Sequence, residues 1–158
     1  MPATVIDVLA REVRALVARL RGFSVTRFAS AAPPFATRGD AAHHLVTSLA
    51  AAAATAEGVP VRPVPRLGDF TLADQLAVVG TDLVAALSAR SDPALAAGAL
   101  GELVLHRRDI DGFAPGQEAV GLLAQAWGCR PVAGEVLLTA TARCSFYAPP
   151  GGSVGPVS

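Results

Sequence analysis

Residues 71–91, TLADQLAVVGTDLVAALSARS, carry the clearest helical pattern of the chain. The large apolar residues of this stretch recur every three or four positions, which places them on one face of an α-helix. They are Leu72, Leu76, Val79, Leu83 and Leu87. A stripe of this kind predicts a helix that packs against other helices through a single apolar face.

Helix starts are marked along the first two thirds of the chain. A hydroxyl followed three residues later by a carboxylate, the pattern of a capping box, occurs at Thr4–Asp7, Thr37–Asp40 and Thr71–Asp74. Asp92 before Pro93 marks a fourth start, because Asp caps helices and Pro suits the first helical position. The predicted ends are Gly22, Gly58, Arg90–Ser91 and Gly112.

The connections predict how these helices are arranged. Residues 58–70 contain Pro60, Pro63 and Pro65, so this segment should be extended and stiff and able to run the length of a bundle. Such a crossover sets the second and third helices parallel, whereas the tight link at Asp92 makes the third and fourth antiparallel. We therefore expect an all-α, four-helix bundle.

The last third of the chain is less regular. A short helix is expected over about 116–127, and residues 135–147, EVLLTATARCSFY, favour a final helix over a strand. We assign residues 1–148 to a single domain and expect the Pro/Gly/Ser-rich residues 149–158 to be a disordered tail. Cys129 and Cys144 are expected to be reduced thiols that pack in the domain.

Composition limits the classes of function. Of 158 residues, 52% are hydrophobic and only 5% aromatic, a balance of Ala, Leu and Val that favours closely packed helices. All 13 basic residues are arginine, a habit of high-GC genomes such as those of actinobacteria, and 13 acidic residues cancel their charge. Nothing indicates nucleic-acid binding. No signal peptide is recognisable, and the Ala-rich residues 45–56 are too short to span a membrane, so a cytoplasmic protein is expected.

The segment before Gly112 carries the first candidate site residues. Glu102 and His106 are four residues apart, so their side chains lie on one helical face, one turn apart. Relative to Leu103 as the centre of the apolar stripe, His106 lies about 60° away and Asp109 on the same edge as Glu102, at roughly 100–120°. A carboxylate and an imidazole that border a buried stripe require partners.

Adjacent histidines in the second helix cannot face the same way. With Leu45 as the centre of the apolar face, His44 lies at its border, about 100° away, and His43 about 160° away. We therefore expect His44 to look inward and His43 to be solvated.

An inward His44 could meet Glu102 and His106 across the bundle. Two imidazoles and one carboxylate with an open position are the pattern of catalytic zinc, and the same set suits iron or nickel. The spacing alone is also compatible with an ordinary His–Glu pair on a half-exposed face.

At these residues the chain resembles the N-terminal domain of the mycothiol-dependent maleylpyruvate isomerases, within the wider DinB/YfiT-like group of metal-binding helical bundles. Residues 37–45, TRGDAAHHL, are similar to the family's T-x-x-D-x-x-x-H-L pattern, and residues 101–110, GELVLHRRDI, to its E-x-x-x-H-x-x-D-[LI] segment. The resemblance covers about residues 4–128. It implies an up-down-down-up bundle and places His44, Glu102 and His106 at the metal-ligand positions. Where the family usually has Pro-Gly-Trp, this chain has Pro34-Phe35-Ala36, which implies a different pocket wall.

The resemblance implies a chemistry in which the metal holds a small thiol, mycothiol in organisms that make it, as a thiolate that attacks an electrophile. The outcome would be S-transfer or isomerisation, with Asp109 orienting His106. A metal-activated water would instead make a hydrolase. A third reading is a non-catalytic ligand-binding or dimerisation module with a vestigial site. Ala-rich helix faces make a homodimer a further expectation. Arg107 and Arg108 would attract an anionic substrate or simply neutralise a helix C-terminus.

Overall fold

The computed structural model describes residues 3–111. The elements are α1 (Val5–Arg21), α2 (Val25–Ala29), α3 (Arg38–Glu57), the 3-10 turn η1 (Asp69–Thr71), α4 (Leu72–Arg90) and α5 (Pro93–Asp111). No strand occurs within residues 3–111, where Ala32 and Phe35 form an isolated bridge, so the predicted all-helical class is confirmed for this part of the chain. The expected helix over 116–127, residues 135–147, the tail at 149–158 and both cysteines lie outside the described residues.

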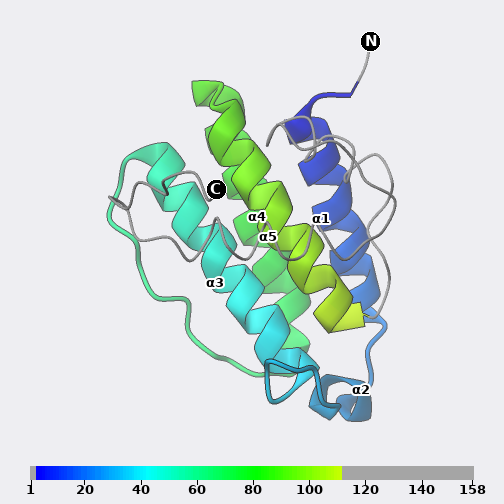
Figure 1. Ribbon diagram of the computed structural model, residues 1–158. Helices are drawn as coiled ribbons and strands as arrows, with labels where there is room; N and C mark the ends of the chain where they lie inside the picture. The colour runs from blue at the N-terminus through cyan, green and yellow to red at the C-terminus, as the bar shows by residue number, and fades with distance from the viewer. Residues whose placement is uncertain (1–2, 112–158) are drawn as a thin grey trace, which may run out of the picture.

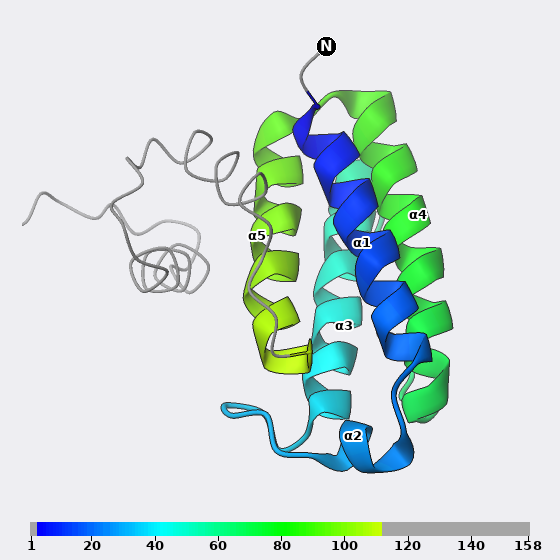
Figure 2. The ribbon, with the colours of Figure 1, turned by 90° about the vertical axis from the view of Figure 1, so that its right-hand side faces the viewer.

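Four long helices lie side by side around a common core (Figures 1 and 2). The helices α1 and α3 each pack against both α4 and α5. The core is built from aliphatic side chains of all four long helices, and its largest fully buried members include Leu9, Leu16, Leu45, Leu76 and Leu103. Every large residue of the predicted stripe in α4 contributes to it. The periodic apolar pattern therefore reports the buried faces correctly.

One of the three predicted capping boxes forms completely, and a second forms in part. The Thr4 hydroxyl accepts a hydrogen bond from the Asp7 amide, and the Asp7 carboxylate accepts one from the Thr4 amide. Thr37 caps α3 through its hydroxyl, which accepts a hydrogen bond from the amide of Asp40 and donates one to the Asp40 carboxylate. Each interaction satisfies a backbone donor that the first turn would otherwise leave unpaired.

The predicted box at Thr71–Asp74 is wrong. Thr71 is the last residue of η1, and its hydroxyl donates to the Gly68 carbonyl instead of capping α4. Asp74 pairs with Arg21 of α1, with 3.2 Å between Oδ1 and Nη2. The 3-10 turn extends the helix backward, so no cap is needed at Thr71. At the fourth start the prediction holds, because Asp92 accepts a hydrogen bond from the amide of Leu95 and Pro93 opens α5.

Helix ends also follow local chemistry. Gly22 ends α1, and Gly58 ends α3 in the left-handed conformation at φ 74° that glycine adopts without strain. Ser91 takes the same conformation at φ 51° at the end of α4. The short helix α2 was not expected from the sequence. Its cap is Ser24, whose hydroxyl accepts from the Arg27 amide, and it buries only Phe28.

The crossover between α3 and η1 runs along the bundle from one end to the other (Figure 1). Polar side chains of the helices hold its proline-rich strip: Nε2 of His43 lies 3.2 Å from the Val64 carbonyl, and the Gln75 amide donates to the Pro65 carbonyl at 2.9 Å. As a result α3 and α4 begin at the same end, as the proline spacing predicts.

Within the described residues, one segment, Asp69–Arg90, has the length and apolar composition that could cross a membrane. Only 33% of its most apolar window is buried inside the bundle. The outward side of α4 is therefore more apolar than a solvated helix face requires.

Candidate metal centre

The candidate centre lies between the first turns of α3 and the last turns of α5. Arg38, the first residue of α3, connects the two helices: its Nη1 donates to the Ile110 carbonyl at 2.7 Å, and its Nε to the Ser30 hydroxyl at 2.8 Å. The Ile110 carbonyl belongs to the last turn of α5, where the helix itself supplies no partner. Arg38 thereby fixes the end of α5 against the start of α3.

Three predicted ligands come together there. One ligand atom each from His44, Glu102 and His106 can be chosen so that all three lie within 4.8 Å of one another. The imidazole rings of His44 and His106 have centroids 5.0 Å apart, and Nε2 of His106 lies 3.1 Å from Oε2 of Glu102. Because metal–ligand bonds are about 2.0–2.2 Å, a small closing movement of the side chains fits the set to one ion.

The environment of the second ring nitrogen supports this fit. Nδ1 of His106 is buried without a hydrogen bond, and its nearest carboxylate oxygen is Oδ2 of Asp109 at 3.8 Å. Metal-bound histidines usually turn their other nitrogen toward a carboxylate, which fixes the tautomer and the ring orientation. Asp109 lies on the Nδ1 side of the ring and Glu102 on the Nε2 side, so Nε2 is the nitrogen that would face a metal shared with Glu102.

The pKa values of the two imidazoles are shifted in opposite directions. Burial lowers the pKa of His106, but the carboxylates of Asp109 and Glu102 outweigh it and raise the pKa to about 9. Burial, and then the charge of His106, lower the pKa of His44. In the metal-free protein at neutral pH, His106 is therefore the charged imidazole and His44 the neutral one.

Phe35 forms the aromatic wall of the site. Its ring centroid lies 5.2 Å from that of His44 and 5.5 Å from that of His106. Phe35 belongs to the Pro34-Phe35-Ala36 segment before α3, and this loop places a phenyl ring against both imidazoles.

The prediction for the two adjacent histidines needs correction. His44 reaches the centre as expected, but it is exposed, so the centre opens to solvent on this side. His43 was expected to be solvated and is half-buried, because the crossover covers its face and receives its ring nitrogen at Val64.

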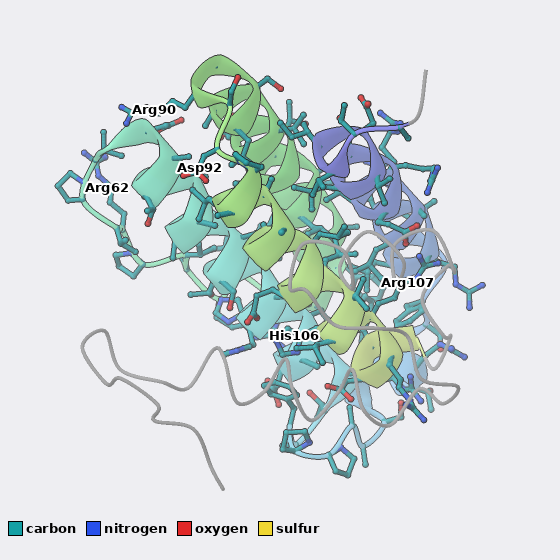
Figure 3. All side chains as sticks on the ribbon, turned by 45° about the horizontal axis from the view of Figure 1, so that its top comes forward. Arg62, Arg90, Asp92, His106 and Arg107 are labelled. Carbon is teal, nitrogen blue, oxygen red and sulfur yellow. The ribbon has the colours of Figure 1, made fainter. Side chains whose placement is uncertain are left out.

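A buried ion pair was missed by the sequence analysis. Glu12 of α1 is 6% exposed and accepts a hydrogen bond from Nη1 of Arg107 on α5. Arg107 therefore points into the bundle toward α1, and neither predicted role, attracting a substrate or neutralising the helix end, describes it (Figure 3). The pair joins residues 95 positions apart, which no local pattern could reveal.

The arrangement has the chemistry of a binding site for a divalent ion. Once a metal displaces the proton of His106, two imidazole nitrogens and one carboxylate oxygen suit zinc, iron and nickel alike. The exposed side at His44 leaves room for a further ligand from solution. Comparison with models of protein families, with curated proteins and with solved structures found no match to this chain.

Proposed function

We propose that this chain is a metal-dependent enzyme of the DinB/YfiT-like type, with an up-down-down-up bundle, and that it uses a small thiol as co-substrate. The observation that carries the proposal is the convergence of His44, Glu102 and His106 within 4.8 Å at a solvent-open end of the α3–α5 contact. Zinc is the first candidate, with iron and nickel as alternatives. The short motifs at residues 37–45 and 101–110 support the family assignment.

Each residue of the site would have a separate role. His44, Glu102 and His106 would hold the ion, and Asp109 would orient His106 from behind. A divalent ion at this position would keep a small thiol, such as mycothiol, in its thiolate form at neutral pH. Phe35 would exclude water from one side of the thiol and hold an apolar part of the electrophile. The expected reactions are S-transfer or isomerisation of a small electrophile.

Metal content is the first test. Purified full-length protein should contain close to one divalent ion per chain by elemental analysis. Glu102→Ala and His106→Ala should each lose it, with at least about 100-fold weaker affinity on reconstitution. His43→Ala is the matched control, because His43 neighbours His44 but turns to the crossover, and it should keep the metal. A wild-type chain that binds no ion after reconstitution would overturn the proposal.

The thiol step has a separate readout. Cobalt-substituted protein should develop a sulfur-to-cobalt charge-transfer band when a small thiol is added. The band should be absent from His106→Ala. A protein that binds cobalt yet shows no band with any thiol retains the metal site and loses the thiol chemistry, which would favour activated water or a non-catalytic site.

A further inference from the structure

We propose that the face formed by α1 and α4 binds a second copy of this chain in a two-fold dimer. This face is remote from His44, Glu102 and His106, so the proposal does not depend on the function of the metal centre. Figure 2 looks onto it, with α1 in front and α4 beside it.

The centre of the face is an apolar groove of about 470 Å³ between the two helices. It exists because both helices present small residues there, and Gly80 lets α1 approach closely, with Val13 occupying the space that a Cβ would need. The groove is lined mainly by Ala and Val: Ala10, Val13, Val17, Ala18, Ala77 and Val84. An apolar hollow between two helices can receive ridges of side chains from another helix.

The apolar surface continues over the outward side of α4. Val78 is 61% exposed, and a second, shallower hollow is lined by Ala77, Val78, Thr81 and Asp82. Together with the low burial of this helix, the two hollows form a continuous patch. Patches of this kind on a folded domain mark interaction sites.

The charges around the patch identify the occupant. Arg14 lies on the α1 border of the groove, and Asp82 lies on the outer border of α4. Both side chains are exposed, and neither forms an ion pair inside the part of the chain that the structure describes. One edge of the face is therefore basic and the other acidic.

These edges are at matching heights. The contact between Arg21 and Asp74 sets the register of the antiparallel pair α1 and α4. Both helices rise by about 1.5 Å per residue, so Arg14, seven residues before Arg21, lies level with position 81, beside Asp82. A two-fold axis parallel to the helices preserves height, and it can place α4 of each copy over the groove of the other, so that α1 of one copy lies beside the outer border of α4 of the other.

In that arrangement Arg14 of each copy faces Asp82 of the other, and each Val78 side meets the opposing groove. Self-complementary charge flanking an apolar centre is what an isologous interface requires. A face two helices wide and about 26 Å long offers on the order of 500 Å² per copy, near the lower limit for specific interfaces. We therefore expect dissociation in the micromolar range.

Charge reversal tests the pairing directly. Sedimentation velocity of the full-length protein between 1 and 200 µM should show a reversible monomer–dimer equilibrium. Arg14→Glu and Asp82→Arg should each weaken it at least tenfold, because each places like charges face to face. The double variant R14E/D82R should restore the dimer dissociation constant to within about threefold of wild type, since ion pairs form again between positions 14 and 82 with the charges exchanged.

Controls separate this face from others. Arg62→Glu changes an exposed arginine on the crossover, away from α1, and should leave the equilibrium unchanged (Figure 3). Thermal unfolding of all variants by circular dichroism should match wild type, because the altered side chains are exposed. A monomer at 200 µM, or a dimer indifferent to both single reversals, overturns the proposal. Binding of a monomeric chain to phosphatidylcholine vesicles would overturn it in favour of a membrane.

Discussion

The helices α4 and α5 follow one another, are each 19 residues long and belong to the same bundle, yet they pack in opposite ways. Every buried side chain of α4 is apolar or absent, and Gly80 brings α1 close. The last three turns of α5 instead direct Glu102 and His106 toward α3 and Arg107 toward α1. Two polar atoms of this part of α5, Nδ1 of His106 and Nε of Arg107, are buried without a hydrogen bond, against one in α4, Oε1 of Gln75.

The difference shows where stability and function lie. Buried aliphatic side chains of α4 stabilise the fold by about 1.5–3 kcal/mol each. Unsatisfied buried polar atoms destabilise it by about 1–3 kcal/mol each, so the polar end of α5 lowers the stability of the fold. Violations of packing rules of this kind are expected at functional sites.

The largest expected effect comes from breaking the buried ion pair between Arg107 of α5 and Glu12 of α1. Arg107→Ala should lower the free energy of unfolding by about 3 kcal/mol, because the buried Glu12 loses its close partner and keeps only the exposed Arg11, whose Nε lies 4.0 Å from Oε1 of Glu12. The double variant Glu12→Leu with Arg107→Met should recover most of the loss, since two apolar side chains remove both charges. Urea unfolding followed by circular dichroism measures both values. A loss below 1 kcal/mol in the single variant would show that the charges are solvated.

The second prediction concerns Asp109 of α5, beside the metal centre. Asp109→Asn should weaken zinc affinity by about 10–100-fold, because the amide no longer fixes the His106 ring as a carboxylate does. Competition with a chromophoric chelator gives the affinity. The exposed Arg108→Ala is the matched control and should change it by less than threefold.

His106 should also make the metal-free protein sensitive to pH. Its pKa is about 9 in the fold against an ordinary value of 6.5, so the protonated form is stabilised by folding. This contribution is fully present below pH 6.5 and is lost as pH rises through 9, an expected fall on the order of 1–3 kcal/mol. Urea midpoints in EDTA across this range test it, and His106→Gln should flatten the profile. A midpoint that rises toward pH 9 would contradict the assignment.

The smallest effect belongs to α4. Gly80→Ala should destabilise the fold by about 1 kcal/mol, because crowding against Val13 outweighs the better helix propensity of alanine. Ser88→Ala, at an exposed position of the same helix, should be nearly neutral. If Gly80→Ala is stabilising, the close approach of α1 to α4 is not required.

Sequence reasoning succeeded where the deciding interactions are local. Thr4, Thr37 and Asp92 reach backbone amides of the turns that they begin, so the starts of three helices follow from a few adjacent residues. Glu102, His106 and Asp109 follow one another at spacings of four and three residues on one helical face, so their neighbourhood is local in the same way. The period of the leucines in α4 determines which of its faces is buried.

Only the tertiary structure decided what depends on distant segments. The crossover buries half of His43 and leaves His44 open, and η1 removes the cap expected at Thr71. Glu12 and Arg107 meet across 95 residues of chain, and Phe35 reaches both imidazoles from a loop. A helical period reports which face of a helix is apolar, but it carries no information on the element that packs there. That choice is made by the packing of the whole chain.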